Sequence, residues 1–257
     1  MTRKKTSGRE GAGAPVPPYA AFAAVYDAYM DHVPYDQWAR YLVGVARALL
    51  GGLPDRVLDL ACGTGALLEE LYGSVGQVSG MDCSREMLRR ARARLPGGDF
   101  RPGRLEATLP FEPGSVSWMV CTHDSLNYLP DHDQLVVHLR SARRLLRPGG
   151  LYSVDFVSLK NIMRNFHGKT AEYDLNGVRL TWSNRYEPRS RVLVSELQFR
   201  RNGEYVLETH HQRFFEEAEI LAAVSEAGLR VCARGGDYSE NPEAQNLWNF
   251  HLQSEEP

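Results

Sequence analysis

Residues 57–65 read VLDLACGTG, an apolar run that changes to small residues just after an aspartate. The valine and leucine residues at the start predict a strand, and the glycines predict a tight turn. Gly63 and Gly65 have no Cβ, so the backbone can bend sharply and a ligand can come close. Residues 66–71, ALLEEL, then begin a helical pattern. A strand, a glycine loop and a helix in this order form a nucleotide-binding corner.

Two classes of ligand use such a corner, and the glycine spacing separates them. A dinucleotide requires G-x-G-x-x-G, which seats the pyrophosphate on the helix N-terminus. Here Gly63 and Gly65 are followed by ALL at residues 66–68, so the third glycine is absent. Asp59 at the strand end would repel an anion and attract an ammonium group. The pattern therefore points to the methionine part of S-adenosylmethionine.

Two motifs in this region resemble those of a known family. Residues 59–65, DLACGTG, resemble the first motif of class I S-adenosylmethionine-dependent methyltransferases, and residues 80–88, GMDCSREML, resemble the second. Asp82 follows Gly65 by about the separation that places an acid on ribose hydroxyls. Residues 145–156, LLRPGGLYSVDF, resemble a further signature of this family. The chain looks closest to uncharacterised bacterial small-molecule methyltransferases that share its YD, DSLNYL and THHQR elements.

The resemblance implies an α/β fold with a Rossmann-like sheet flanked by helices. Seven strands are expected, mostly parallel, with the last pair antiparallel. Residues 171–215 change to an alternating apolar pattern, and Asn-Gly pairs at 176–177 and 202–203 predict tight turns within it. These antiparallel hairpins are expected to form an inserted β subdomain, which in this family often covers the substrate.

The chain divides into five expected regions. Residues 1–18 are rich in Gly, Ala, Pro and basic residues and have few large apolar side chains, which predicts a disordered tail. Residues 19–50 form an N-terminal helical lid, residues 51–157 the S-adenosylmethionine-binding core, and residues 158–215 the inserted region. Residues 216–257 supply a helix and the strand pair that completes the core.

Composition limits the class of protein further. The chain has 257 residues and 43% hydrophobic content, enough for a substantial core, and its net charge of −2 argues against a general nucleic-acid binder. Because no stretch reads as a secretory segment or as an apolar span of about 20 residues, we expect a cytoplasmic protein without a membrane partner. The cysteines lie far apart and outside C-x-x-C pairs, which predicts reduced thiols and no metal site; they are Cys62, Cys83, Cys121 and Cys232.

The resemblance also implies which residues hold S-adenosylmethionine. Asp59, Ala61 and the glycine loop would hold the methionine moiety, and Asp82 the ribose. Side chains after the second, third and fourth strands would lie near the adenine and the sulfonium, with aromatic residues of the lid above them. The full expected set is Tyr19, Tyr26, Trp38, Asp59, Ala61, Cys62, Gly63, Gly65, Asp82, Cys83, Met87, Leu105, Glu106, Thr122 and His123.

Methyl transfer from a sulfonium to a small-molecule acceptor is a direct in-line displacement, so the protein mainly positions the reactants and excludes water. Residues 122–129, THDSLNYL, follow the fourth strand, where functional loops of parallel sheets lie. An amine acceptor must lose a proton, and His123, Tyr128 or His211 is the expected helper. His210 and His211 are neighbours on a strand and cannot both face the site. A thiolate acceptor would need no base.

Other readings remain open from the sequence. His123 can equally be a packing residue. A nicotinamide-dependent oxidoreductase uses a similar sheet, although the missing third glycine argues against it. A non-catalytic protein that binds S-adenosylmethionine and acts through a partner would carry the same motifs, and so would an enzyme with a modified sulfonium donor.

Overall fold

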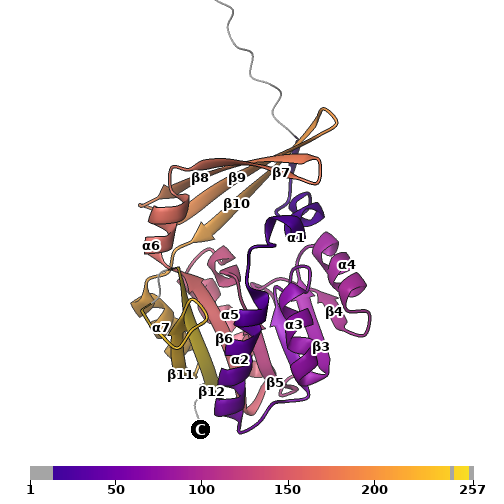
Figure 1. Cartoon of the computed structure of the whole chain (residues 1–257). Helices are drawn as coiled ribbons and strands as arrows, with labels where there is room; N and C mark the ends of the chain where they lie inside the picture. Colours follow the sequence, from indigo (N-terminus) through magenta and orange to yellow (C-terminus); the bar gives the residue numbers. More distant parts are fainter. Residues whose placement is uncertain (1–13, 244–245, 255–257) are drawn as a thin grey trace, which may run out of the picture.

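A sheet of seven strands forms the core of the structure, a computed structural model that describes residues 14–243 and 246–254 (Figure 1). Its order is β11-β12-β6-β5-β2-β3-β4. The strands are β2 Arg56–Leu60, β3 Gln77–Asp82, β4 Asp99–Pro102, β5 Val116–Cys121, β6 Leu146–Val157, β11 Leu229–Gly236 and β12 Leu247–Ser254. Strands β2 to β6 pair in parallel, and β12 is antiparallel to both of its neighbours. This arrangement confirms the expected fold.

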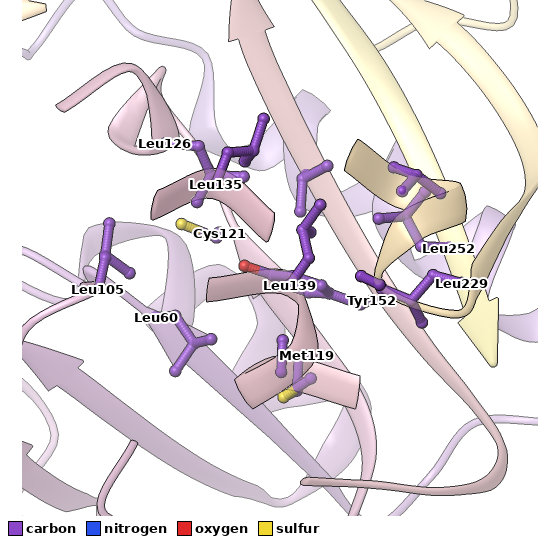
Figure 2. Packing of buried hydrophobic residues seen from close by; sticks show 14 of the residues in the cluster. Leu60, Leu105, Met119, Cys121, Leu126, Leu135, Leu139, Tyr152, Leu229 and Leu252 are labelled. Carbon is purple, nitrogen blue, oxygen red and sulfur yellow. The ribbon is translucent and has the colours of Figure 1, made fainter. Parts of the chain in front are cut away.

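Helices cover both faces of this sheet. Figure 2 shows one core, in which Leu139 lies beside Tyr152 and Leu135 beside Cys121 of the strands. Alternate strand residues such as Trp118 turn to the opposite face and form the other core. Helices α5 His132–Leu145 and α7 Glu217–Glu226 cover the first face, and helices α2 Tyr35–Leu50, α3 Ala66–Val75 and α4 Arg85–Arg94 cover the second.

The order in which successive strands are added to the sheet reverses between β2 and β5. Strands β3 and β4 follow β2 on one side, whereas β5 and β6 lie on its other side. At such a switch point the loops beyond the carboxyl ends of the strands separate and leave a crevice. The crevice here lies between the loops that follow β2, at residues 61–65, and β5, at residues 122–124.

A second sheet, the insert, has the order β1-β10-β9-β8-β7 and lies over the carboxyl edge of the core (Figure 1). Its strands are β1 Ala14–Val16, β7 Thr170–Leu175, β8 Val178–Glu187, β9 Val192–Arg201 and β10 Glu204–Arg213. Asn176 and Asn202 and the glycines that follow them all have positive φ, as tight hairpin turns require. The predicted antiparallel hairpins are therefore confirmed. Short helices, α6 Leu159–Asn161 and η3 Ile162–Phe166, connect β6 to the insert.

The prediction of a disordered tail over residues 1–18 is wrong for its last part. Strand β1 pairs in parallel with β10, because the outer edge of β10 offers unpaired backbone groups to a passing segment. Residues 1–13 lie outside the described residues.

Residues 19–50, the segment expected to act as a lid and called the lid below, begin with two short helical turns, η1 Phe22–Ala24 and α1 Tyr26–Tyr29, before α2. Phe22 and Val25 are buried against Leu180 and Leu197 of the insert. The lid therefore lies between the insert and the core, as Figure 1 shows for α1. Within the described residues, no helix combines the length and apolarity needed to cross a bilayer.

Candidate active site

A cavity of about 520 Å³ opens at the crevice between β2 and β5. Its walls come from the ends of β2, β3 and β5, from the start of α4 and from the lid. Fourteen of the predicted site residues line it: Tyr19, Tyr26, Asp59, Ala61, Cys62, Gly63, Asp82, Cys83, Met87, Leu105, Glu106, Thr122, His123 and Tyr128. We call this space the first cavity.

The loop after β2 is shaped by left-handed backbone conformations. Ala61, Gly63 and Gly65 have φ values of 71°, 54° and 79°. The N–H groups of Ala61 and Cys62 both donate to the carbonyl of Met81, which ties the loop to β3. Gly65 does not line the first cavity. A Cβ on Gly65 would lie 3.4 Å from Cβ of Ala91, an ordinary contact distance, so it is the positive φ and not a lack of room that favours glycine here.

The carboxylate of Asp82 is fixed by two backbone donors. The N–H of Gly63 donates to it at 2.9 Å and the N–H of Ser84 at 2.8 Å. Burial raises the pKa of Asp82, and these hydrogen bonds oppose that rise. Each carboxylate oxygen keeps a second acceptor position. Asp82 can therefore accept further hydrogen bonds from hydroxyl groups of a ligand in the first cavity.

Asp59 is buried, with 2% of its surface exposed, and its Oδ1 atom has no hydrogen-bond partner within the described part of the chain. Burial raises the pKa of Asp59 well above its ordinary range, and the negative charges of Asp82 and Asp155 raise it further. A buried carboxylate of this kind is costly unless a cation or a donor meets it. The ammonium group of S-adenosylmethionine supplies both, so the residues present fit this cofactor.

At the other end of the first cavity, Cys83, Met87 and Leu105 form an apolar wall. Glu106, one of the predicted cofactor contacts, also lines the cavity, and its Oε1 accepts from Nε of Arg104 at 2.6 Å. This ion pair engages one oxygen of the carboxylate. The contact of Glu106 with the cofactor stays a prediction.

A second cavity of about 330 Å³ lies between the lid, the insert and the loop after β5. It shares four lining residues with the first cavity, and the four form the junction of the two spaces: Tyr19, Tyr26, His123 and Tyr128. Trp38 lines the second cavity and not the first. Its ring stacks on Tyr238 at a centroid distance of 4.0 Å, so Trp38 does not lie where a cofactor contact was predicted.

The backbone at the junction is held by a buried acid. His123 and Asp124 both adopt left-handed conformations, with φ values of 62° and 52°. Their N–H groups donate to the Asp155 carboxylate at 2.8 and 2.6 Å, and the Tyr238 hydroxyl donates to the same group. For residues other than glycine, this backbone conformation costs about 1–3 kcal/mol per residue, so it persists only where surrounding contacts stabilise it. The hydrogen bonds to Asp155 provide this stabilisation and so position His123.

His123 is a neutral imidazole at neutral pH, because burial lowers its pKa to about 4. Its Nδ1 atom is buried and has no partner in the part of the chain that the structure describes. The ring lies 5.2 Å from that of Trp38. His123 can therefore exchange a hydrogen bond with a ligand at the junction.

A chain of hydrogen bonds leads from the junction into the insert. The Tyr19 and Tyr128 hydroxyls are 2.7 Å apart, and the Tyr128 hydroxyl is 2.7 Å from Nδ1 of His210. Nε2 of His210 is 2.9 Å from the Glu208 carboxylate, which is fully buried. Because a carboxylate only accepts, Nε2 carries the proton, and Nδ1 of the neutral ring accepts from Tyr128.

The structure does not bring His211 to the site. It is exposed on the opposite face of β10 and lines neither cavity, whereas His210 lines the second one. The sequence established that only one of the two could face inward, and it is His210, not the predicted His211, that lines a cavity. Asp124, Asp155 and Glu208 were not among the predicted site residues, although Asp124 lies in the loop at residues 122–129 and Asp155 in the signature at residues 145–156.

All four cysteines are unpaired, with Cys62 and Cys121 buried and Cys83 exposed. Across residues 14–243 and 246–254, no three His, Cys, Asp or Glu side chains gather in an arrangement that could hold a metal ion.

The crevice holds Asp59, whose Oδ1 has no partner among the described residues, and the fixed carboxylate of Asp82, and it fits an S-adenosylmethionine-binding enzyme. Comparisons with known proteins agree. Residues 57–150 match the family described as methyltransferase domain. A dTDP-3-amino-3,4,6-trideoxy-alpha-D-glucopyranose N,N-dimethyltransferase of Streptomyces venezuelae is 30% identical over 191 residues, which cover 68% of this chain and 75% of the relative. YqeM of Bacillus subtilis, itself an inferred methyltransferase, is 29% identical over 238 residues, 89% of this chain and 93% of that one.

A solved structure shows the same fold. The crystal structure of a S-adenosylmethionine-dependent methyltransferase from Clostridium acetobutylicum gives a TM-score of 0.79 at 22% identity, covering 93% of this chain and 99% of that chain. The chain therefore belongs to the class I S-adenosylmethionine-dependent methyltransferases. It is an enzyme whose cofactor is S-adenosylmethionine.

Proposed function

We propose that this enzyme transfers a methyl group to a small-molecule acceptor held in the second cavity, by direct in-line displacement. The observation that carries the proposal is the junction, where Tyr19, Tyr26, His123 and Tyr128 belong to both cavities. Positioning of two reactants across such a junction can supply about 7–11 kcal/mol of the barrier. S-adenosylmethionine supplies a methyl group on a positively charged sulfur.

Each acid of the first cavity has a proposed role in binding. Asp59 receives the ammonium group of the methionine moiety at its unpaired Oδ1. Asp82 accepts from the ribose hydroxyls while the N–H groups of Gly63 and Ser84 hold it in place. Cys83, Met87 and Leu105 contact the adenine.

The residues at the junction have proposed roles in the transfer. Tyr19 and Tyr26 cover the reacting atoms and exclude water. His123 offers its neutral Nδ1 to the acceptor. Tyr128 passes a proton released by the acceptor to His210. His210 thus takes the part that the sequence gave to His211.

Isothermal titration calorimetry tests the cofactor part of this proposal. We expect micromolar binding of S-adenosylmethionine and of its demethylated product, and none of NADH. Asp82→Ala should weaken binding of both sulfur ligands about tenfold. Asp99→Ala is the matched control, because Asp99 lies on the neighbouring strand in an exposed pair with Arg101. Equal affinities of the two variants would contradict the role of Asp82.

Labelled-methyl transfer to a cell extract tests the second part. The label should appear in molecules small enough for a cavity of about 330 Å³. Label recovered only in protein or nucleic acid would refute the small-molecule acceptor.

A further inference from the structure

We propose that the second cavity selects an acceptor that carries a basic amine, which binds as a cation between Asp124 and a set of aromatic rings, and that this nitrogen is methylated. The inference rests on the function proposed above, because it takes the second cavity as the acceptor site. It goes further by naming the chemical class of the acceptor.

Aromatic side chains form much of the wall of this cavity. Its ring-bearing residues from the lid and the insert include Tyr19, Phe22, Tyr26, Tyr29, Trp38 and Trp182. They pack against one another, with centroids 5.0 Å apart for Tyr29 and Trp182 and 5.5 Å apart for Phe22 and Trp182. A cation within about 6 Å of such a ring face is attracted by it, most strongly where water is excluded.

The wall of the second cavity carries a carboxylate. Asp124 lines this cavity and not the first, and no residue that lines it in the described chain is Lys or Arg. Arg213, which follows the cavity residue Gln212 on β10, pairs instead with Glu219 at 2.8 Å. Burial raises the pKa of Asp124, so its carboxylate gains from a cationic partner.

The backbone at Asp124 is held in place, and its side chain hydrogen-bonds Gln212, which also lines the second cavity. The N–H of Asp124 donates to Asp155 at 2.6 Å, and the φ of 52° at Asp124 is set by the same turn that presents His123 at the junction. An amine held by Asp124 therefore lies next to the point where the two cavities meet. An acceptor with a carboxylate or phosphate would meet the like charge of Asp124 and neither Lys nor Arg among the described lining residues, which costs affinity.

The proton and electron balance is complete with the groups present. The bound ammonium gives one proton to the path through Tyr128 to His210, which exposes the nitrogen lone pair. That lone pair forms the new C–N bond while the C–S bond breaks, and its electrons leave with the sulfur. The net products are the methylated amine, the neutral thioether and one proton.

The test uses benzyltrimethylammonium, a permanent cation that cannot be methylated, titrated by calorimetry into protein saturated with S-adenosylhomocysteine. Phenylacetate is the anionic comparator of similar size. We expect the cation to bind and phenylacetate not to bind. Asp124→Asn keeps the shape and should weaken cation binding about tenfold. Glu196→Gln is the matched control, because Glu196 is exposed on β9 beside Ser195, which faces the cavity.

Each outcome decides a separate point. Phenylacetate that binds as tightly as the cation, no binding of the cation, or equal cation affinity in Asp124→Asn and the wild type would overturn the amine proposal. Unchanged S-adenosylhomocysteine affinity in Asp124→Asn shows that the variant is folded. If S-adenosylhomocysteine binds and the cation does not, the methyltransferase assignment stands. If neither ligand binds, the basis of the proposed function is removed.

Discussion

Glu208 ties the lid to the insert, and its replacement by glutamine gives a sharp test of that role. One carboxylate oxygen accepts from the N–H groups of Ala21 and Phe22, at 2.5 and 2.9 Å. The other accepts from the N–H of Tyr19 at 2.8 Å and from His210 at 2.9 Å. Glu208→Gln keeps the size of the side chain but removes its charge and puts an NH₂ donor where an oxygen now faces two donors.

The magnitude follows from these contacts. A hydrogen bond to a charged group contributes about 1.5–3 kcal/mol. The substitution removes at least two of them, so docking of the first turn of the lid should weaken by about 3 kcal/mol or more. This difference corresponds to a change of roughly a hundredfold in the population of the undocked state.

Hydrogen exchange measures this population directly. In Glu208→Gln, protection of the amides of Tyr19, Ala21 and Phe22 should fall by about a hundredfold, while that of the core sheet stays unchanged. Glu204→Gln is the control, because Glu204 is exposed on the same strand. Unchanged protection at the three amides would refute the role of Glu208 as the anchor of the lid.

The other predictions concern buried titratable side chains. Asp59→Ala should weaken S-adenosylmethionine binding at least about tenfold in calorimetry, since it removes the partner of the ammonium group, and near-wild-type binding would disprove this. Burial raises the pKa of Asp155 to about 6, so kcat should fall as pH drops through this value, and in Asp155→Asn that acid limb should disappear. Burial lowers the pKa of His138 to about 4. As pH falls, this histidine is therefore protonated in the unfolded chain before it is protonated in the folded one. The free energy of unfolding, measured in urea, should decrease from about pH 6.5 to about pH 4, and this decrease should be smaller in His138→Gln.

The cofactor half of the site could be predicted because its geometry is encoded locally. Asp59, Asp82 and Met87 each lie within a few residues of a strand end, and all line the first cavity. The path of a parallel strand fixes where the next residues lie. Sequence patterns over ten residues are therefore sufficient to place them.

The acceptor half depends on contacts between distant parts of the chain. Glu208 bonds to backbone groups 186 to 189 residues away, and Asp155 bonds to Tyr238 across 83 residues. Alternation along β10 shows that His210 and His211 face opposite sides. The face of β10 that lies against the lid depends on how the insert packs on the core. No local sequence pattern predicts this packing.

The junction has a kinetic consequence. Tyr19 and Tyr26 belong to the walls of both cavities, and both lie on the same short stretch of the lid. In the function proposed above, a movement of this stretch would uncover both cavities together. Methylated product and spent cofactor would then leave through one opening, and the rate of that movement would set an upper limit on turnover, however fast the methyl group is transferred.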